Sequence, residues 1–188
     1  MLAALLVPRA TCASPLSTAR GLHTFLTGKW QLDKTFSYVR GGAPGTFSGT
    51  ASFNALACAD DILRLQYYEE GTAVLKGDRP MVLPATRRLL WEFAPNGNDY
   101  LVSVYFDESC SGAGNVAVVQ SARFFHSIQL SPDGATPPPF DHPCGPDVYR
   151  GRLSLRMSDE FVLRWDVIGP RKTGTQLLCY KRVGDHTG

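Results

Sequence analysis

The chain has 188 residues, of which 44% are hydrophobic and 19% charged, so it is long enough for one sizeable core and too apolar to be disordered. Its 19 basic and 17 acidic residues leave a formal net charge of +2, which argues against a nucleic-acid-binding protein that depends on bulk charge. No apolar run approaches the length that crosses a bilayer, so we expect no membrane span.

The first 22 residues differ in composition from the rest of the chain. They contain Arg9 and Arg20 but no acidic residue, and the apolar stretch that opens them ends at Pro8, before the first charge. A secretory signal would place its positive charge first, whereas an acid-poor leader with Arg and Ser is typical of an organelle transit peptide. We therefore predict a disordered leader over residues 1–22 that directs the chain to mitochondria. The alternative is an unstructured tail on a cytoplasmic protein.

Alternating apolar and polar residues predict β-strands through the body of the chain. In residues 28–39, for example, Trp30, Leu32, Phe36 and Tyr38 lie on one face, and residues 87–106 form a hairpin around an Asn-Gly turn. Similar segments occur at residues 45–53, 61–71, 122–130, 149–157, 160–169 and 175–183. About eight or nine strands without helices between them predict an all-β fold, a single antiparallel up-and-down β-barrel, because closure hides the edges of such a sheet.

The two ends of this body resemble the calycins, the superfamily of lipocalins, fatty-acid-binding proteins and nitrobindins. A short apolar turn precedes Gly28-x-Trp30, and a strand follows. The resemblance implies a short N-terminal helix that plugs one barrel end, Trp30 packed beneath it, and Arg182 of the last strand lying across the indole. The domain is expected to span residues 23–183, with a tail at residues 184–188.

A second and more specific resemblance covers about residues 25–182. The order of the segments FLTGKW, YYEEG, RRLLW, FFH, HPCGPDVYRG and WDVIGPRK is similar to that of DUF6314, an uncharacterised calycin-like family of unknown function. The chain departs from the compact form of that family at residues 72–85 and 107–122, which look lengthened. The resemblance implies a fold and no reaction.

The segment FDHPCGPDVYRG, residues 140–151, gathers His142, Cys144, Asp147 and Tyr149. Its prolines argue against a helix or a central strand, so we expect the first three side chains on a stiff loop over a barrel end and Tyr149 at the start of the next strand. A metal site, a cysteine nucleophile beside a histidine, and a turn capped by Asp147 are all compatible with this pattern. The five cysteines show no C-x-x-C spacing, and we assign no metal.

A barrel of this size leaves room for one small ligand. We expect aromatic walls and a few polar groups that orient the ligand. Arg164 would hold an anionic head group with help from Arg87, Arg88 or Arg123, unless it pairs with Asp166. The predicted cavity and rim residues are Tyr67, Trp91, Phe93, Phe124, His126, His142, Cys144, Asp147, Tyr149, Arg164, Trp165 and Lys172. His126 could equally be a satisfied core histidine.

Three functions are compatible with the predicted barrel. The first, which we favour, is a barrel that binds a partly apolar and anionic small molecule without catalysis. The second is an enzyme that uses His142, Cys144, Asp147 or Tyr149 for proton transfer or nucleophilic attack. The third is a filled barrel that serves as an accessory or protein-interaction subunit in an organelle. We expect no cofactor, with haem held by a histidine as the alternative, and no nucleic-acid partner; the oligomeric state is open.

Overall fold

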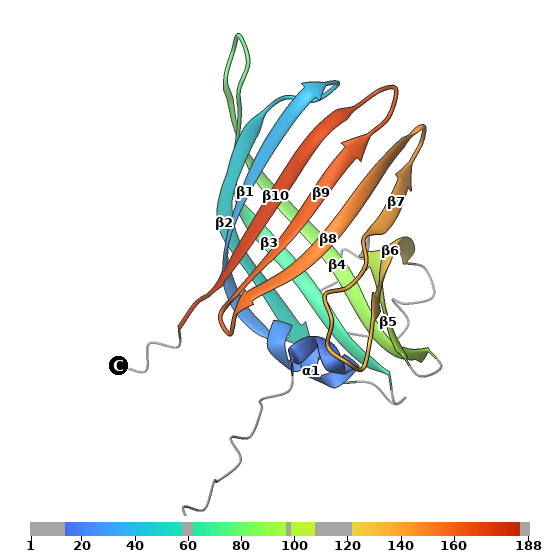
Figure 1. Cartoon of the computed structure of the whole chain (residues 1–188). Helices are drawn as coiled ribbons and strands as arrows, with labels where there is room; N and C mark the ends of the chain where they lie inside the picture. The colour runs from blue at the N-terminus through green and yellow to red at the C-terminus, as the bar shows by residue number, and fades with distance from the viewer. Residues whose placement is uncertain (1–13, 58–61, 97–98, 108–121, 185–188) are drawn as a thin grey trace, which may run out of the picture.

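The predicted strands form one antiparallel sheet that curls into a nearly closed barrel (Figure 1). The computed structural model describes residues 14–57, 62–96, 99–107 and 122–184. Within them the strands are β1 (Gly28–Arg40), β2 (Gly45–Ala55), β3 (Leu63–Leu75), β4 (Met81–Asn96), β5 (Asp99–Phe106), β6 (Arg123–Leu130), β7 (Phe140–Cys144), β8 (Asp147–Met157), β9 (Glu160–Ile168) and β10 (Thr173–Arg182). Each strand pairs with its neighbours in the chain except that β6 and β7, the two edges of the sheet, do not pair, and β1 also pairs with β10. The predicted up-and-down barrel is confirmed.

The described sheet has ten strands rather than eight or nine, and β7 is the strand that the sequence did not reveal. Pro143 led to the prediction of a loop. However, β7 is the last strand in the sheet order and pairs with β8 alone, and an edge strand tolerates proline because one of its sides needs no ladder hydrogen bonds. His142 and Cys144 therefore lie on this edge strand and not on a loop.

Of the two segments predicted to be lengthened, the structure describes the first fully and the second only at its ends. Residues 72–85 lie in the β3–β4 hairpin, whose two strands continue past the rim of the barrel (Figure 1). Most of the other segment, residues 108–121, lies outside the described residues, as do residues 1–13 and 185–188.

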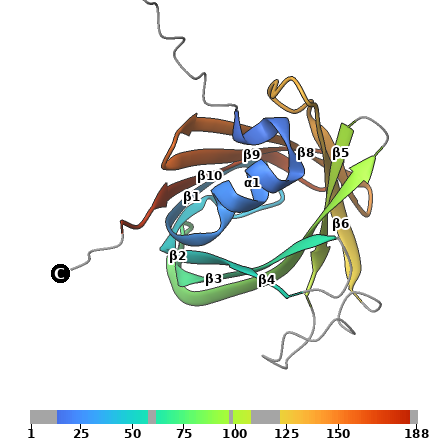
Figure 2. The ribbon, with the colours of Figure 1, turned by 90° about the horizontal axis from the view of Figure 1, so that it is seen from below.

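A short helix, α1 (Ala19–Leu26), lies across one end of the barrel (Figure 2). The 3₁₀ turn η1 (Pro15–Ser17) precedes it, and the Oγ1 of Thr18 caps its start by accepting the N–H of Gly21 at 2.8 Å. Leu16, Leu22 and Leu26 are buried in the core. The folded part thus begins earlier than the expected residue 23, because the first turns already carry core side chains.

The end of this helix is fastened to the first and last strands. Trp30 is fully buried, and its Nε1 donates to the carbonyl of Leu26 at 2.8 Å. The guanidinium of Arg182 lies 4.2 Å from the Trp30 ring centroid and donates to the carbonyls of Phe25 and Thr27. These bonds satisfy carbonyls that the last turn of a helix leaves without partners.

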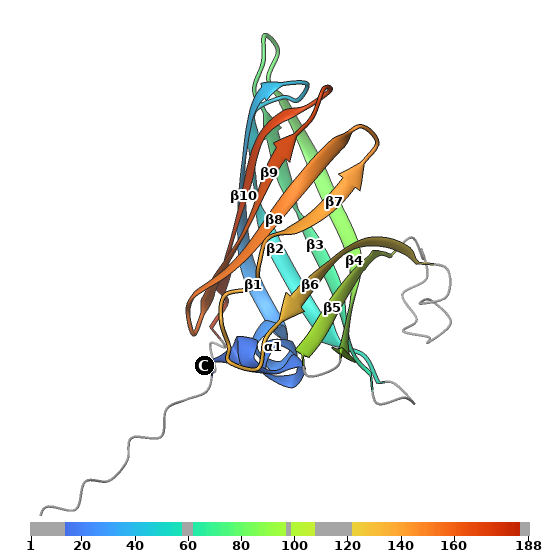
Figure 3. The ribbon, with the colours of Figure 1, turned by 45° about the vertical axis from the view of Figure 1, so that its right-hand side comes forward.

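The barrel closes between β6 and β7 through side chains rather than a strand ladder (Figure 3). Nδ1 of His142 donates to the carbonyl of Phe125 at 2.7 Å. That carbonyl is available because the register between β5 and β6 shifts at Phe125, which forms a β-bulge. The ring of Phe140 also stacks on His126, with centroids 4.7 Å apart. Ring contacts and this hydrogen bond therefore join β6 to β7. We call this gap in the strand ladder the seam.

The core is densest beneath α1. Trp30, Phe53 and Phe161 are almost fully buried there, and Phe161 stacks on Tyr180 with ring centroids 4.1 Å apart. Within the described residues, no helix combines the length and apolar character needed to cross a membrane. Because side chains fill the barrel interior at the α1 end, the interior space in which a ligand could bind lies toward the opposite, open end.

Candidate ligand-binding site

A cavity of about 260 Å³, the mouth cavity, opens at the end of the barrel opposite α1. Aromatic rings and polar groups from eight strands and one turn line it. Its lining residues are Tyr38, Arg87, Phe106, Phe125, His142, Cys144, Tyr149, Trp165, Lys172 and Gln176. Strands β5, β6 and β7 are shorter than β4, so the wall is lowest on the side where Phe125 and His142 meet (Figure 3).

Two cationic side chains reach the mouth cavity, Arg87 from β4 and Lys172 from the β9–β10 turn. Arg87 leaves 45% of its side chain exposed. Lys172 lies beside the hydroxyl of Tyr149, an interaction that raises the pKa of the ammonium above its usual value. Burial raises the pKa of the Tyr149 phenol, which therefore stays protonated as a hydrogen-bond donor. The cavity thus presents two positive charges and at least one neutral donor.

Below Arg87, a polar cluster is buried inside the barrel. Glu69 accepts hydrogen bonds from Nζ of Lys34 and from the hydroxyl of Tyr67, whose oxygen lies 3.1 Å from that of Tyr180. Burial lowers the pKa of Lys34 to about 8, against the opposing effect of Glu69. Nε of Arg87 lies 3.8 Å from a Glu69 oxygen that Lys34 already neutralises. The charge of Arg87 is therefore left to act on the cavity above.

A second, enclosed space, the inner cavity, lies beside this cluster and measures about 20 Å³. His126 and Trp91 are both lining residues, and both are buried. Nδ1 of His126 and Nε1 of Trp91 have no hydrogen-bond partner among the described residues. Burial, with a smaller effect of His142, lowers the pKa of His126 to about 3, so its imidazole is neutral at physiological pH.

The structure distributes the predicted site residues over three levels. His142, Cys144, Tyr149 and Lys172 line the mouth cavity. Tyr67, Trp91 and His126 line the inner cavity, and Trp165 borders both cavities. Phe93 lies nearer α1, where it contacts the ring of His23 at 5.5 Å between centroids.

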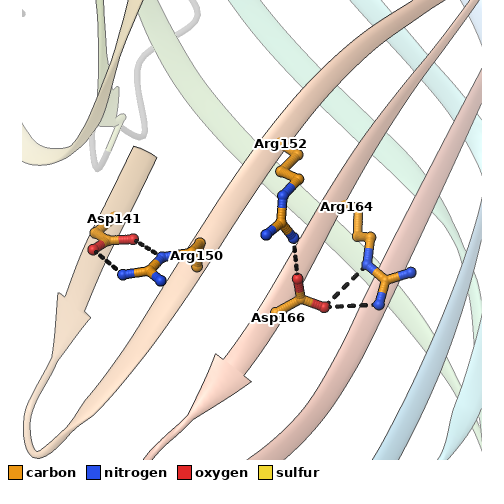
Figure 4. A network of polar contacts seen from close by, with 5 residues as sticks. All are labelled: Asp141, Arg150, Arg152, Arg164 and Asp166. Atoms are coloured by element: carbon orange, nitrogen blue, oxygen red, sulfur yellow. Dashed lines mark hydrogen bonds and ion pairs between the residues drawn. The ribbon is translucent and has the colours of Figure 1, made fainter. Parts of the chain in front are cut away.

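Two residues expected inside lie on the outer face. Phe124 is 54% exposed, because the bulge turns Phe125 inward in its place. Arg164 is exposed and pairs with Asp166 at 2.9 Å, in a network that also includes Arg152 (Figure 4). Its neighbour Trp165 faces the core, and adjacent strand residues point to opposite faces, so Arg164 cannot hold a ligand there.

Asp147 does not face the mouth cavity. It is buried, and its Oδ1 accepts the backbone N–H groups of Arg171 at 2.9 Å and Lys172 at 3.2 Å. A Cβ at Gly169 would lie 2.1 Å from the same oxygen, so the turn requires glycine there. Asp147 thus shapes the β9–β10 turn and sets the position from which Lys172 reaches the cavity.

The predicted catalytic rim does not assemble into a reacting pair. His142 directs Nδ1 at the carbonyl of Phe125, and its ring centroid lies 6.1 Å from that of Tyr149. No hydrogen bond joins two of the four side chains His142, Cys144, Asp147 and Tyr149, all of which the structure describes. A cysteine nucleophile needs a base within hydrogen-bond reach.

Two observations bear on a metal or haem site in the described part of the chain. Groups of three His, Cys, Asp or Glu side chains that could hold a metal ion do not occur there. The free nitrogen of His126 faces a space of about 20 Å³, too small for a porphyrin. His142 lines the mouth cavity, and its Nδ1 donates to the carbonyl of Phe125, so Nε2 is the nitrogen left for a ligand.

Several lining residues were missed at the sequence level. Phe125 is the most informative of them, because the β-bulge places Phe125 and His126, two consecutive side chains, inside, which strict alternation cannot predict. Tyr38 and Gln176 lie opposite it and hydrogen-bond to each other at 2.6 Å. No pattern distinguishes these two from other strand residues near a turn.

The comparisons with known proteins agree with this barrel. The model of a family described as "Family of unknown function (DUF6314)" matches residues 26–182. The solved structure of the S-type phycobiliprotein lyase CPES from Guillardia theta is similar, with a TM-score of 0.59 and 10% sequence identity over 89% of this chain and 94% of the lyase chain. At that identity the likeness shows the fold alone. No curated protein matches the sequence.

Proposed function

The chain belongs to this family of unknown function, DUF6314, and we propose that it binds a small, partly apolar anion in the mouth cavity, without catalysing a reaction. The proposal depends mainly on one observation: two cationic side chains, Arg87 and Lys172, and several aromatic rings line the same cavity. The similar barrel of a protein named as a phycobiliprotein lyase supports a role for the fold beyond a packed scaffold.

The charge arrangement favours an anion. Lys34 neutralises Glu69, so Arg87 and Lys172 are the ionised groups that face the opening. Tyr149 and Gln176 add polar groups at the same level. Charge-assisted hydrogen bonds from a guanidinium and an ammonium are well suited to a carboxylate.

The walls favour a planar apolar body. Phe125 and Trp165 lie nearly parallel, with centroids 5.6 Å apart and 27° between the ring planes. Phe106 extends this surface, since its ring lies 4.5 Å from that of Phe125. A volume of about 260 Å³ is just below the range of about 300–1,000 Å³ that holds drug-sized ligands, so it suits a small aromatic acid.

Calorimetric titration with cinnamate, a planar aromatic carboxylate, tests the proposal, with cinnamamide as the uncharged analogue. Wild-type protein should prefer cinnamate, and Arg87→Gln/Lys172→Gln should remove that preference. One charged hydrogen bond contributes about 1.5–3 kcal/mol, so we expect at least about a tenfold loss of cinnamate affinity. The matched control Lys29→Gln/Lys181→Gln removes two charges from exposed positions at the α1 end and should bind as wild type. Equal affinities in the two double variants would contradict the proposal.

The remaining alternatives lack a comparable observation. An enzyme would need two rim groups joined around the cavity, and the four predicted ones are not. A purely structural subunit would need a filled interior, whereas an opening lined by ionised groups is left at one end. Mitochondrial targeting by residues 1–22 belongs to the proposal as an expectation from sequence, and import of the full chain into isolated mitochondria tests it.

A further inference from the structure

The inner cavity contains an unusual pair of unpartnered polar atoms. Trp91 and His126 leave only 4% and 1% of their surfaces exposed, and neither Nε1 of Trp91 nor Nδ1 of His126 has a partner among the described residues. A buried donor without an acceptor costs about 1–3 kcal/mol. Two such atoms lining one enclosed space point to a group that enters it from outside.

We infer that the inner cavity is a subsite for one hydroxyl group, and that the ligands of this protein are hydroxylated aromatic acids. The inference rests on the proposed function and extends it to the far end of the ligand. An indole N–H can only donate, so Trp91 requires an oxygen acceptor. The neutral imidazole of His126 can accept a hydrogen bond at Nδ1, so a single hydroxyl satisfies both atoms.

The size of the inner cavity agrees with a single oxygen. About 20 Å³ is enough for one water-sized group, since about 10–15 Å³ already suffices for a water molecule. A methyl group would fill the same space but would leave both nitrogens unpartnered. The inner cavity therefore discriminates by hydrogen bonding rather than by shape.

The two cavities are neighbours that share Arg87, Phe125 and Trp165 as lining residues. Phe125 lies on the bulge beside the gap between β6 and β7, and its ring is part of the partition between the two cavities. With its carboxylate at Arg87 and Lys172, a linear acid would lay its ring along Trp165 and send its far substituent toward His126. A 4-hydroxy acid has this arrangement.

Paired ligands that differ in one substituent test the subsite. The pairs are 4-hydroxybenzoate with 4-methylbenzoate, and 4-hydroxycinnamate with 4-methylcinnamate, titrated by calorimetry into wild type and Trp91→Phe. In the tighter-binding pair, the hydroxyl acid should bind at least tenfold more tightly to wild type. The variant keeps an aromatic ring but has no N–H, so the preference should fall to threefold or less while the methyl acid binds unchanged.

Indole N–H resonances in ¹⁵N-labelled protein provide a direct readout. The chain has three tryptophans, and Nε1 of Trp30 already donates to Leu26, which makes it an internal reference. The hydroxyl acid should move the Trp91 resonance strongly and leave that of Trp30 in place. Equal binding of both pair members with a stationary Trp91 resonance would overturn the subsite and leave the proposed function standing. Failure of all four acids to bind would overturn both.

A second inference comes from a different surface, the rim strip, which we define as residues 39–45, 75–83 and 168–172 around the open end. These segments adjoin: the N–H of Lys76 donates to the carbonyl of Pro44 at 2.7 Å, and Arg40 donates to the carbonyl of Gly169 at 2.7 Å. Apolar side chains project from it without cover, with Val39 at 89% and Val82 at 67% exposed. The β3–β4 hairpin, to which Val82 belongs, projects beyond the barrel (Figure 1).

The same strip is strongly basic. Its three segments contain five basic residues, namely Arg40, Lys76, Arg79, Arg171 and Lys172, and one acid, Asp78, so its net charge is 5 − 1 = +4. Exposed apolar side chains among basic residues match the interface of an anionic lipid bilayer, which attracts each nearby cation by about 1 kcal/mol. The geometry points to docking of the open end on an anionic membrane, which would place the mouth cavity at the lipid surface.

Sedimentation with vesicles tests this docking. The full chain should bind vesicles of phosphatidylcholine mixed equally with phosphatidylglycerol, should bind pure phosphatidylcholine at least tenfold less, and should be released by salt. Val82→Asp should lower the bound fraction at least tenfold. Val183→Asp is the matched control, because Val183 is 43% exposed near the opposite end. Absence of binding to the anionic vesicles, or equal binding by the two variants, would overturn the inference.

Discussion

Replacing His126 with phenylalanine tests the buried imidazole that separates the core from the ligand-binding end. Burial lowers the pKa of His126 from 6.5 to about 3. In the unfolded chain the same imidazole takes up a proton near pH 6.5. Between these values the unfolded state therefore binds more protons than the folded state. The stability that the neutral imidazole contributes is complete above pH 6.5 and is lost as the pH falls toward 3.

The magnitude follows from this shift. Each pH unit below 6.5 costs up to about 1.4 kcal/mol, so His126 alone should remove about 2 kcal/mol of stability between pH 7 and pH 5. Urea unfolding followed by circular dichroism at the two pH values measures the free energy of unfolding of wild type and His126→Phe. The pKa values of His23 and His142 are lowered as well, mainly by burial, but both residues are present in both proteins.

The comparison therefore isolates one imidazole. The wild type should lose about 2 kcal/mol more than His126→Phe when the pH falls from 7 to 5. Phenylalanine keeps the ring that stacks on Phe140, so the variant should fold. If both proteins lost the same free energy, His126 would not be buried as a neutral group in the folded protein.

Three further predictions concern stability. Lys34→Met should cost up to about 3–5 kcal/mol in urea unfolding, because buried Glu69 loses the cation that hydrogen-bonds to it and keeps the more distant Arg87 at 3.8 Å. Lys34→Met/Glu69→Leu should recover most of this loss, and no recovery would refute the pairing. His142→Phe removes the hydrogen bond that spans the seam, so it should cost about 1 kcal/mol and speed amide exchange in β7; unchanged exchange would argue against the seam. Arg182→Met should cost about 1–3 kcal/mol by releasing the end of α1, whereas Lys181→Met on the outer face should be neutral; equal effects would contradict the clamp.

Sequence patterns predicted most of the barrel, since ten strands with alternating side chains can hide their edges only by closing. The patterns failed where a strand departs from strict alternation of inward and outward side chains or from the usual residue types of a strand. At Phe125 one extra residue turns two consecutive side chains inward, so alternation placed Phe124 in the cavity by mistake. At Pro143 an edge strand tolerates a residue that a central strand excludes, so β7 read as a loop.

The candidate site was only partly visible for a related reason. Aromatic wall residues such as Trp91 and Trp165 follow from the alternation of their strands. The charged groups depend on tertiary contacts: Arg164 finds an outer partner in Asp166, whereas Arg87 lies over a Glu69 that Lys34 has already neutralised. The net charge near Arg87 depends on residues from β1, β3 and β4 together. A pattern within one of these segments therefore cannot predict it.

Native mass spectrometry of the chain purified from its own source tests the central claim most directly, because it asks whether the open end of the barrel retains an acid. Wild-type protein should carry an adduct with the mass of a small organic acid, and Arg87→Gln/Lys172→Gln, purified in the same way, should be bare. Identical spectra for the two proteins, with or without an adduct, would contradict the claim that these two cations hold a ligand.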